Sequence, residues 1–178
     1  MKTRLSRPLI VAVYACFFLS GMTGLVYEVV WMRQLSLVLG HTTYAITAVL
    51  GAFMAGLALG SFLLGRLVDR RGRPLALYGL LEAGIGLSAL VVPLLFGQIE
   101  RLYPVLLQGL GLTPFALSLV QFALVTLILL VPTTLMGATL PVLSKFSVAR
   151  LDRLGRNVGQ LYALNTFGAV AGAGAAGY

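Results

Sequence analysis

The sequence predicts an all-α fold, a multi-pass transmembrane helical bundle of about five spans that forms one domain over residues 1–178. Hydrophobic residues make up 59% of the chain and charged residues only 10%, whereas soluble domains average roughly 45–50% and roughly 25%. The apolar residues form runs long enough to cross about 30 Å of hydrocarbon at about 1.5 Å per residue. Basic residues gather in alternate polar segments, which is typical of membrane proteins.

The apolar runs place the spans, in chain order, at residues 9–30, 43–65, 74–97, 114–141 and 158–178. The first run follows a basic start but is too long for a secretory signal core and ends in no small-residue cleavage site, so we interpret it as a retained helix. In the fourth run, Pro132 and Pro141 are expected to kink the helix, and nearby threonines can bond the freed carbonyls.

Two polar segments are expected to connect spans at the outer side. Segment 31–42 is expected as a short connection, with Trp31 in the aromatic belt at the membrane interface. Segment 98–113 is expected as the second outer loop, with a short interfacial helix as the alternative.

The basic residues set the expected orientation. Eleven of the thirteen lie in three segments that alternate with the outer ones: Lys2, Arg4, Arg7, Arg66, Arg70, Arg71, Arg73, Lys145, Arg150, Arg153 and Arg156. Because cytoplasmic segments carry the excess of lysine and arginine, we expect the N-terminus in the cytoplasm and the C-terminus outside. The net charge of +8 is therefore interpreted as a topology signal with some attraction for anionic lipid, which argues against a nucleic-acid partner.

The loop at residues 65–73 is compact and strongly charged. Its key positions are Gly65, Asp69, Arg70, Gly72 and Arg73. Gly72 allows a tight turn, Asp69 can accept hydrogen bonds, and arginines can reach lipid headgroups. The pattern resembles the signature loop of the major facilitator superfamily, and a generic positively charged turn is the alternative.

Two glycine pairs have a spacing that favours helix packing. Gly56 and Gly60 lie four residues apart in the second span, and Gly168 and Gly172 do so in the fifth. That spacing puts both glycines of a pair on one helix face, where backbones can approach closely. The alternative is that glycine is simply common in membrane helices.

Two acids fall within apolar runs. Glu82 lies about 12 Å into the third span, whereas Glu28 lies near the outer end of the first, where water and Arg33 are within reach. Carboxylates in a membrane usually face a cavity, a partner or a proton path. Glu82 is therefore the better candidate for a cation or proton site, and a protonated acid bonded to a neighbouring carbonyl is the alternative.

Other chemistry has little support in the sequence. The single cysteine, Cys16, and the single histidine, His41, exclude an intrachain disulfide and a multi-histidine metal site. Residues 172–177 formally match a G-x-G-x-x-G fingerprint, but the strand and the acidic residue that it requires are missing. We expect neither a metal nor a cofactor in this chain.

Four segments carry a more specific resemblance: residues 20–33, 56–60, 136–141 and 161–170. They resemble the membrane region of fused major-facilitator/spermidine-synthase proteins, part of a major-facilitator N-terminal half. The motif residues that transfer are Tyr27, Glu28, Trp31 and Asn165. The resemblance implies a bacterial inner-membrane protein linked to polyamine metabolism, with a soluble aminopropyltransferase-like domain as a possible partner. The catalytic positions of such a domain do not exist here, so the chain itself is not expected to be an enzyme.

Three functions remain open from the sequence. The favoured one is a membrane module that docks a catalytic or transport partner. The second is a half-transporter that oligomerises to move a small cationic solute, since a facilitator half has six helices. The third is an accessory structural subunit that packs against other membrane helices.

Overall fold

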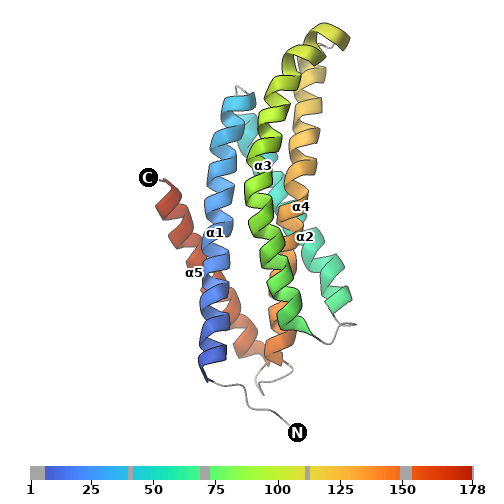
Figure 1. The fold of residues 1–178 in the computed structure, drawn as a ribbon. Coiled ribbons are helices and arrows are strands. Elements are labelled where there is room, and N and C mark those ends of the chain that lie inside the picture. The colour runs from blue at the N-terminus through green and yellow to red at the C-terminus, as the bar shows by residue number, and fades with distance from the viewer. Residues whose placement is uncertain (1–6, 40–41, 69–72, 111–112, 149–153, 178) are drawn as a thin grey trace.

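The part of the chain that the structure describes folds into a bundle of five helices (Figure 1). The computed structural model describes residues 7–39, 42–68, 73–110, 113–148 and 154–177. The helices are α1 (Arg7–Leu39), α2 (Thr42–Val68), α3 (Pro74–Leu110), α4 (Pro114–Val148) and α5 (Leu154–Gly177). Within these ranges there is no strand. The all-α prediction is therefore confirmed.

Four of the helices, α1 to α4, are long and apolar enough to cross a membrane. This finding confirms that the chain is built as a transmembrane protein. The fifth helix, α5, coincides with the fifth expected span but does not belong to that group. Five helices were thus expected and found, and a membrane crossing by α5 stays a prediction.

Both outer segments are more helical than a loop, and for segment 98–113 the structure agrees with the helical alternative. Helix α1 continues to Leu39 and α3 continues to Leu110, so most of segments 31–42 and 98–113 is helical and not loop. The polar residues in these segments include glutamine, glutamate and arginine, which are good helix formers. Polarity alone therefore marks where a helix leaves the apolar layer and does not mark where it ends.

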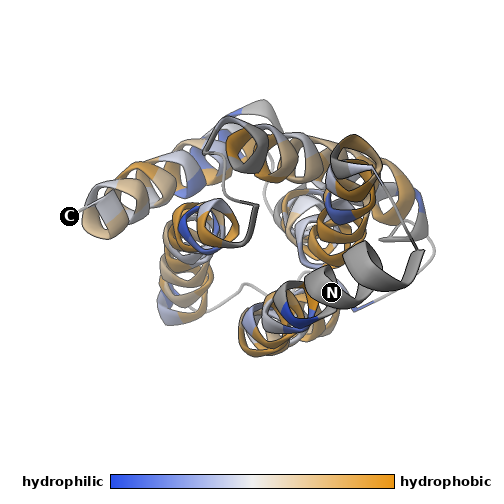
Figure 2. Ribbon diagram, turned by 90° about the horizontal axis from the view of Figure 1, so that it is seen from above, coloured by the Kyte–Doolittle hydropathy of each residue, from blue (hydrophilic) through white to orange (hydrophobic). Residues whose placement is uncertain are grey.

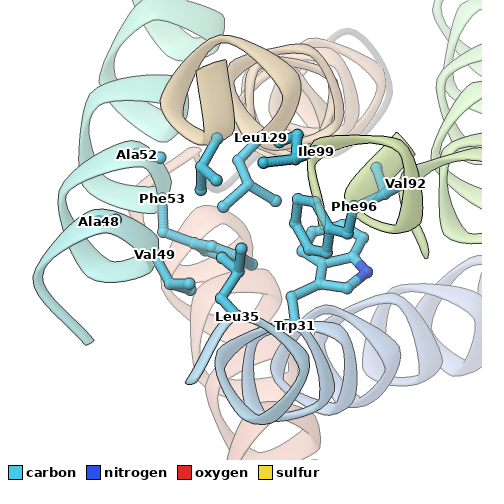
Figure 3. Packing of buried hydrophobic residues seen from close by; sticks show 11 residues of the cluster. Trp31, Leu35, Ala48, Val49, Ala52, Phe53, Val92, Phe96, Ile99 and Leu129 are labelled. Carbon is cyan, nitrogen blue, oxygen red and sulfur yellow. The ribbon is translucent and has the colours of Figure 1, made fainter. Parts of the chain in front are cut away.

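Trp31 does not lie in an interfacial belt, because it is a core residue with 1% of its surface exposed. Its indole packs against Phe53 of α2 at a ring-centroid distance of 6.2 Å. Figure 3 shows Trp31 and Phe96 side by side within a cluster contributed by the first four helices. The extension of α1 explains the difference, since it carries Trp31 along the bundle interior and not across its surface.

Close helix pairs hold the bundle together, above all α2 with α4 and α1 with α5. Gly56 and Gly60 lie against α4, where a Cβ at either position would collide with Thr133 or with the backbone of Thr134. Gly168 and Gly172 lie in the same way against the α1 backbone. Both glycine pairs are therefore occupied by contacts within the chain.

Threonine hydroxyls add polar contacts to the α2–α4 pair. Thr133 is fully buried, and its hydroxyl reaches the Ala52 carbonyl of α2 at 3.3 Å as well as the Leu129 carbonyl of its own helix at 2.7 Å. The Thr133 hydroxyl thus serves the contact between helices in addition to its own helix.

Pro132 and Pro141 both lie inside the continuous helix α4.

The outer faces of the helices are apolar. Leu90, Leu94 and Phe115 expose 71%, 70% and 79% of their surface. Figure 2 shows hydrophobic residues distributed around the helices and not only toward the bundle interior. In water such surfaces would drive aggregation, whereas lipid tails cover them favourably.

The described basic residues lie mainly at one end of the bundle. This end comprises the start of α1, the end of α2, the start of α3, the end of α4 and the start of α5 (Figure 1). It carries Arg7, Arg66, Arg73, Lys145 and Arg156. The fold therefore brings segments far apart in the sequence into one basic end, as the alternation of basic segments predicts.

Candidate functional site

A cleft of about 570 Å³ lies between α1 and α3. Its walls run from Leu9 to Tyr27 on α1 and from Leu75 to Gly86 on α3. The stretch on α3 corresponds to about 16 Å at about 1.5 Å per residue, roughly half of the hydrocarbon thickness. The cleft is thus an elongated groove that follows the helix axes.

Glu82 lines this cleft, one helical turn beyond Tyr78. Its Oε1 atom is buried and has no hydrogen-bond partner among the described residues. The Tyr78 hydroxyl interacts with the Glu82 carboxyl and the Ser20 hydroxyl, but neither approach has the geometry of a hydrogen bond. A carboxylate offers about four acceptor positions, so one tyrosine hydroxyl could not satisfy it in any case.

Tyr78 gives the cleft a second unsatisfied polar group. Only 5% of its surface is exposed, and its hydroxyl is buried without a partner in the described part of the chain. The ring is fixed by an edge-on contact with Phe17 at a centroid distance of 6.4 Å. Unpaired buried polar groups cost roughly 1–3 kcal/mol each, and among the described residues Tyr78 and Glu82 are the two such side chains that line this cleft.

Small residues occur on both walls of the cleft, between larger apolar ones such as Leu19 and Ile85. On α1 they are Ala12, Cys16 and Ser20, which follow one another at four-residue intervals. On α3 they are Gly79 and Gly86, and a Cβ at either glycine would meet nothing within 4 Å. These glycines differ from those in the α2–α4 and α1–α5 contacts, since open space lies beside them.

Tyr27 lies at the far end of the cleft. Its ring stacks on Trp31 with centroids 5.5 Å apart and an angle of 18° between the ring planes. The aromatic end of the cleft is thereby anchored in the hydrophobic core. Of the candidate site residues Glu82, Glu28, Tyr27, Trp31 and Asn165, the fold brings Tyr27 and Glu82 to one cleft.

The other motif residues lie elsewhere. Asn165 of α5 faces α1, where its side-chain amide donates to the Phe17 carbonyl at 3.4 Å and lies against Gly21. Glu28 is half-buried in α1 and does not line the cleft. Arg33, expected near Glu28, donates to the carbonyl of Gly177 at 3.0 Å and so ties the end of α5 to α1.

The signature loop is only partly described. Gly65 lies in α2 near Pro141, and Arg73 is exposed just before α3, where its carbonyl accepts a hydrogen bond from the Leu77 amide at 3.2 Å. Asp69, Arg70 and Gly72 lie outside the described residues, as does His41.

The described residues contain no group of three histidine, cysteine, aspartate or glutamate side chains that could hold a metal ion. Cys16 is exposed on the α1 wall of the cleft. The sequence analysis considered this thiol only as a disulfide candidate and did not connect it with Glu82. It also overlooked Tyr78, although its position four residues before Glu82 places both on one helix face.

No family model matches the chain, and no curated protein or solved structure is significantly similar to it. The fold and the cleft define the class as a helical membrane protein with a mainly apolar groove that holds one buried acid.

Proposed function

We propose that this chain is a membrane module that docks a membrane-embedded partner through the cleft between α1 and α3. The observation that carries the proposal is the unsatisfied pair of Glu82 and Tyr78 in a groove that has small residues on both walls. Lipid tails offer no hydrogen bonds, so a partner that supplies them gains free energy that lipid cannot provide.

The structure of the cleft also favours docking over a purely lipid-filled groove. Small residues on both walls let another helix backbone approach closely, which is how helices associate where water contributes no hydrophobic drive. The glycine pairs of α2 and α5 are used within the chain. Gly79 and Gly86 are not, and they lie in the cleft that also holds the polar pair.

The wider setting rests on the sequence. The motifs around Tyr27 and Asn165 support a partner that acts in polyamine or related amine metabolism. They also support a fold that corresponds to part of a major-facilitator half. The basic end of the bundle supports a cytoplasmic N-terminus, and the same resemblance supports a bacterial inner membrane.

A second candidate function is binding of a small cationic solute in a half-transporter. One observation favours it, because a volume of about 570 Å³ falls within the range of small-molecule sites and contains a single acid. The elongated shape and the open space beside Gly79 and Gly86 favour the docking function instead.

Native mass spectrometry of the full chain extracted from its own membranes tests the proposal. We expect the wild type to be found in a complex, and the double variant Gly79→Leu/Gly86→Leu to be found as a monomer because leucine side chains fill the cleft. The matched control is Gly97→Leu, on the same helix but outside the cleft and with nothing within 4 Å of its Cβ position. A monomeric wild type, or a complex that survives in the double variant, would contradict docking at this cleft.

A further inference from the structure

We infer that the occupant of the α1–α3 cleft is a transmembrane helix of the partner that carries a lysine or an arginine facing Glu82. The inference rests on the proposed docking function and adds the chemistry of the partner. It is carried by charge complementarity at Glu82 and by the shape of the groove.

The charge argument begins with the missing counter-ion. Oε1 of Glu82 is buried without a hydrogen-bond partner in the ranges that the structure describes. The described basic residues lie toward the helix ends, and two of them are engaged there: Arg33 donates to the Gly177 carbonyl, and Arg66 covers the Phe62 ring at 4.1 Å. Acids within membranes usually pair with a basic group or with backbone carbonyls. The cation that pairs with Glu82 therefore comes from outside the described part of this chain.

The shape argument selects a helix as the occupant. The groove follows α3 for about 16 Å, which is about three helical turns. Cys16 and Ser20 on one wall and Gly79 and Gly86 on the other leave room for a backbone along this length. A compact ammonium ion would fill only the region around the acid and leave the glycine surfaces against lipid.

The donor on the partner has a defined depth. Glu82 lies about 12 Å from the start of α3 at Pro74, which corresponds to eight residues. A partner helix lying along the groove would thus carry its lysine or arginine about eight residues from the end that lies beside the basic end of the bundle. The Tyr78 hydroxyl lines the same cleft and is buried without a hydrogen-bond partner among the described residues, so it offers the same group a second acceptor.

The test uses synthetic helices and the single tryptophan of the chain. Leucine–alanine peptides of about 21 residues span a bilayer. One carries a lysine about eight residues from the end that matches the basic end of the bundle, and a matched peptide carries leucine there. Each peptide bears a dansyl acceptor and is added to the full chain in phosphatidylcholine vesicles. Energy transfer from Trp31, which contacts Tyr27 at the end of the cleft, reports binding.

We expect the lysine peptide to bind the wild type roughly five- to thirtyfold more tightly than the leucine peptide, the factor that corresponds to an interhelical polar contact in model peptides. In Glu82→Gln this preference should disappear. In Gly86→Leu both peptides should lose affinity, whereas Gly97→Leu should behave as the wild type.

The contrary outcomes separate the two proposals. Equal binding of both peptides to the wild type would overturn the charged partner and leave the docking function standing. Equal binding to Gly86→Leu and Gly97→Leu would place the helix outside the cleft and overturn both. Protection of the Cys16 thiol from N-ethylmaleimide by putrescine, with no binding of either peptide, would also overturn both and assign the cleft to a small cationic solute.

Discussion

Replacing Gly56 by alanine should weaken the contact between α2 and α4. A Cβ at this position would collide with the Thr133 side chain and would lie 3.0 Å from the Thr133 carbonyl carbon. Since backbone atoms of α4 are part of the obstacle, turning the threonine does not remove the clash. The two helices must move apart, which also lengthens the hydrogen bond from the Thr133 hydroxyl to the Ala52 carbonyl, now 3.3 Å.

The size of the effect follows from these contacts. Overpacking a well-filled contact costs about 1–3 kcal/mol, and an interhelical hydrogen bond in a membrane contributes on average about 0.6 kcal/mol. Alanine is a better helix former than glycine by up to about 1 kcal/mol, which opposes the loss. The matched control Gly51→Ala lies on the same helix with nothing within 4 Å of its Cβ position, so it gains helix propensity without any clash. The two variants should therefore differ by roughly 2–4 kcal/mol.

Unfolding by sodium dodecyl sulfate in mixed micelles measures this difference. The single tryptophan, Trp31, is 1% exposed and packs on Phe53 of α2, so its fluorescence reports the integrity of the bundle. Gly56→Ala should unfold at a lower detergent fraction than the wild type, and Gly51→Ala at an equal or higher one. Equal midpoints for the two alanine variants would refute the close approach of α2 and α4 at Gly56.

Three further predictions concern packing, topology and catalysis. Gly168→Ala, whose Cβ would collide with the α1 backbone, should unfold about 1–3 kcal/mol more easily than Gly174→Ala, which has open space beside it; equal stability in the same detergent titration would argue against the α1–α5 contact. In a Cys16→Ala background, a cysteine at Thr3 should resist an impermeant thiol reagent in intact cells and one at Thr42 should react; the reverse labelling pattern would invert the orientation. The purified chain should form no spermidine from putrescine and the decarboxylated donor, because its five acids are scattered along the sequence; product formation that is lost on mutating its own residues would show that the membrane module is itself catalytic.

The sequence was sufficient to predict one residue of the candidate site, but not the residues that surround it. The depth of Glu82 in an apolar run was sufficient to single it out, because a carboxyl inside a membrane is costly wherever the helix lies. Its surroundings were not visible in the sequence. Tyr78 lies on the same helix face, but Ser20 and Cys16 come from a helix more than 55 residues away, and only the packing of α1 beside α3 brings them into one cleft.

The sequence by itself determined the helical, membrane-spanning class and the basic end of the bundle, because hydrophobic length and charge distribution act locally along the chain. It left open what each small residue meets, since four-residue spacing defines a face and not the neighbour of that face. The tertiary structure placed Gly56 against Thr133 and left Gly79 beside open space. It also buried Trp31, expected at the interface, because α1 continues to Leu39. Contacts between distant helices depend on how whole surfaces fit together, and a single position in the sequence does not encode that fit.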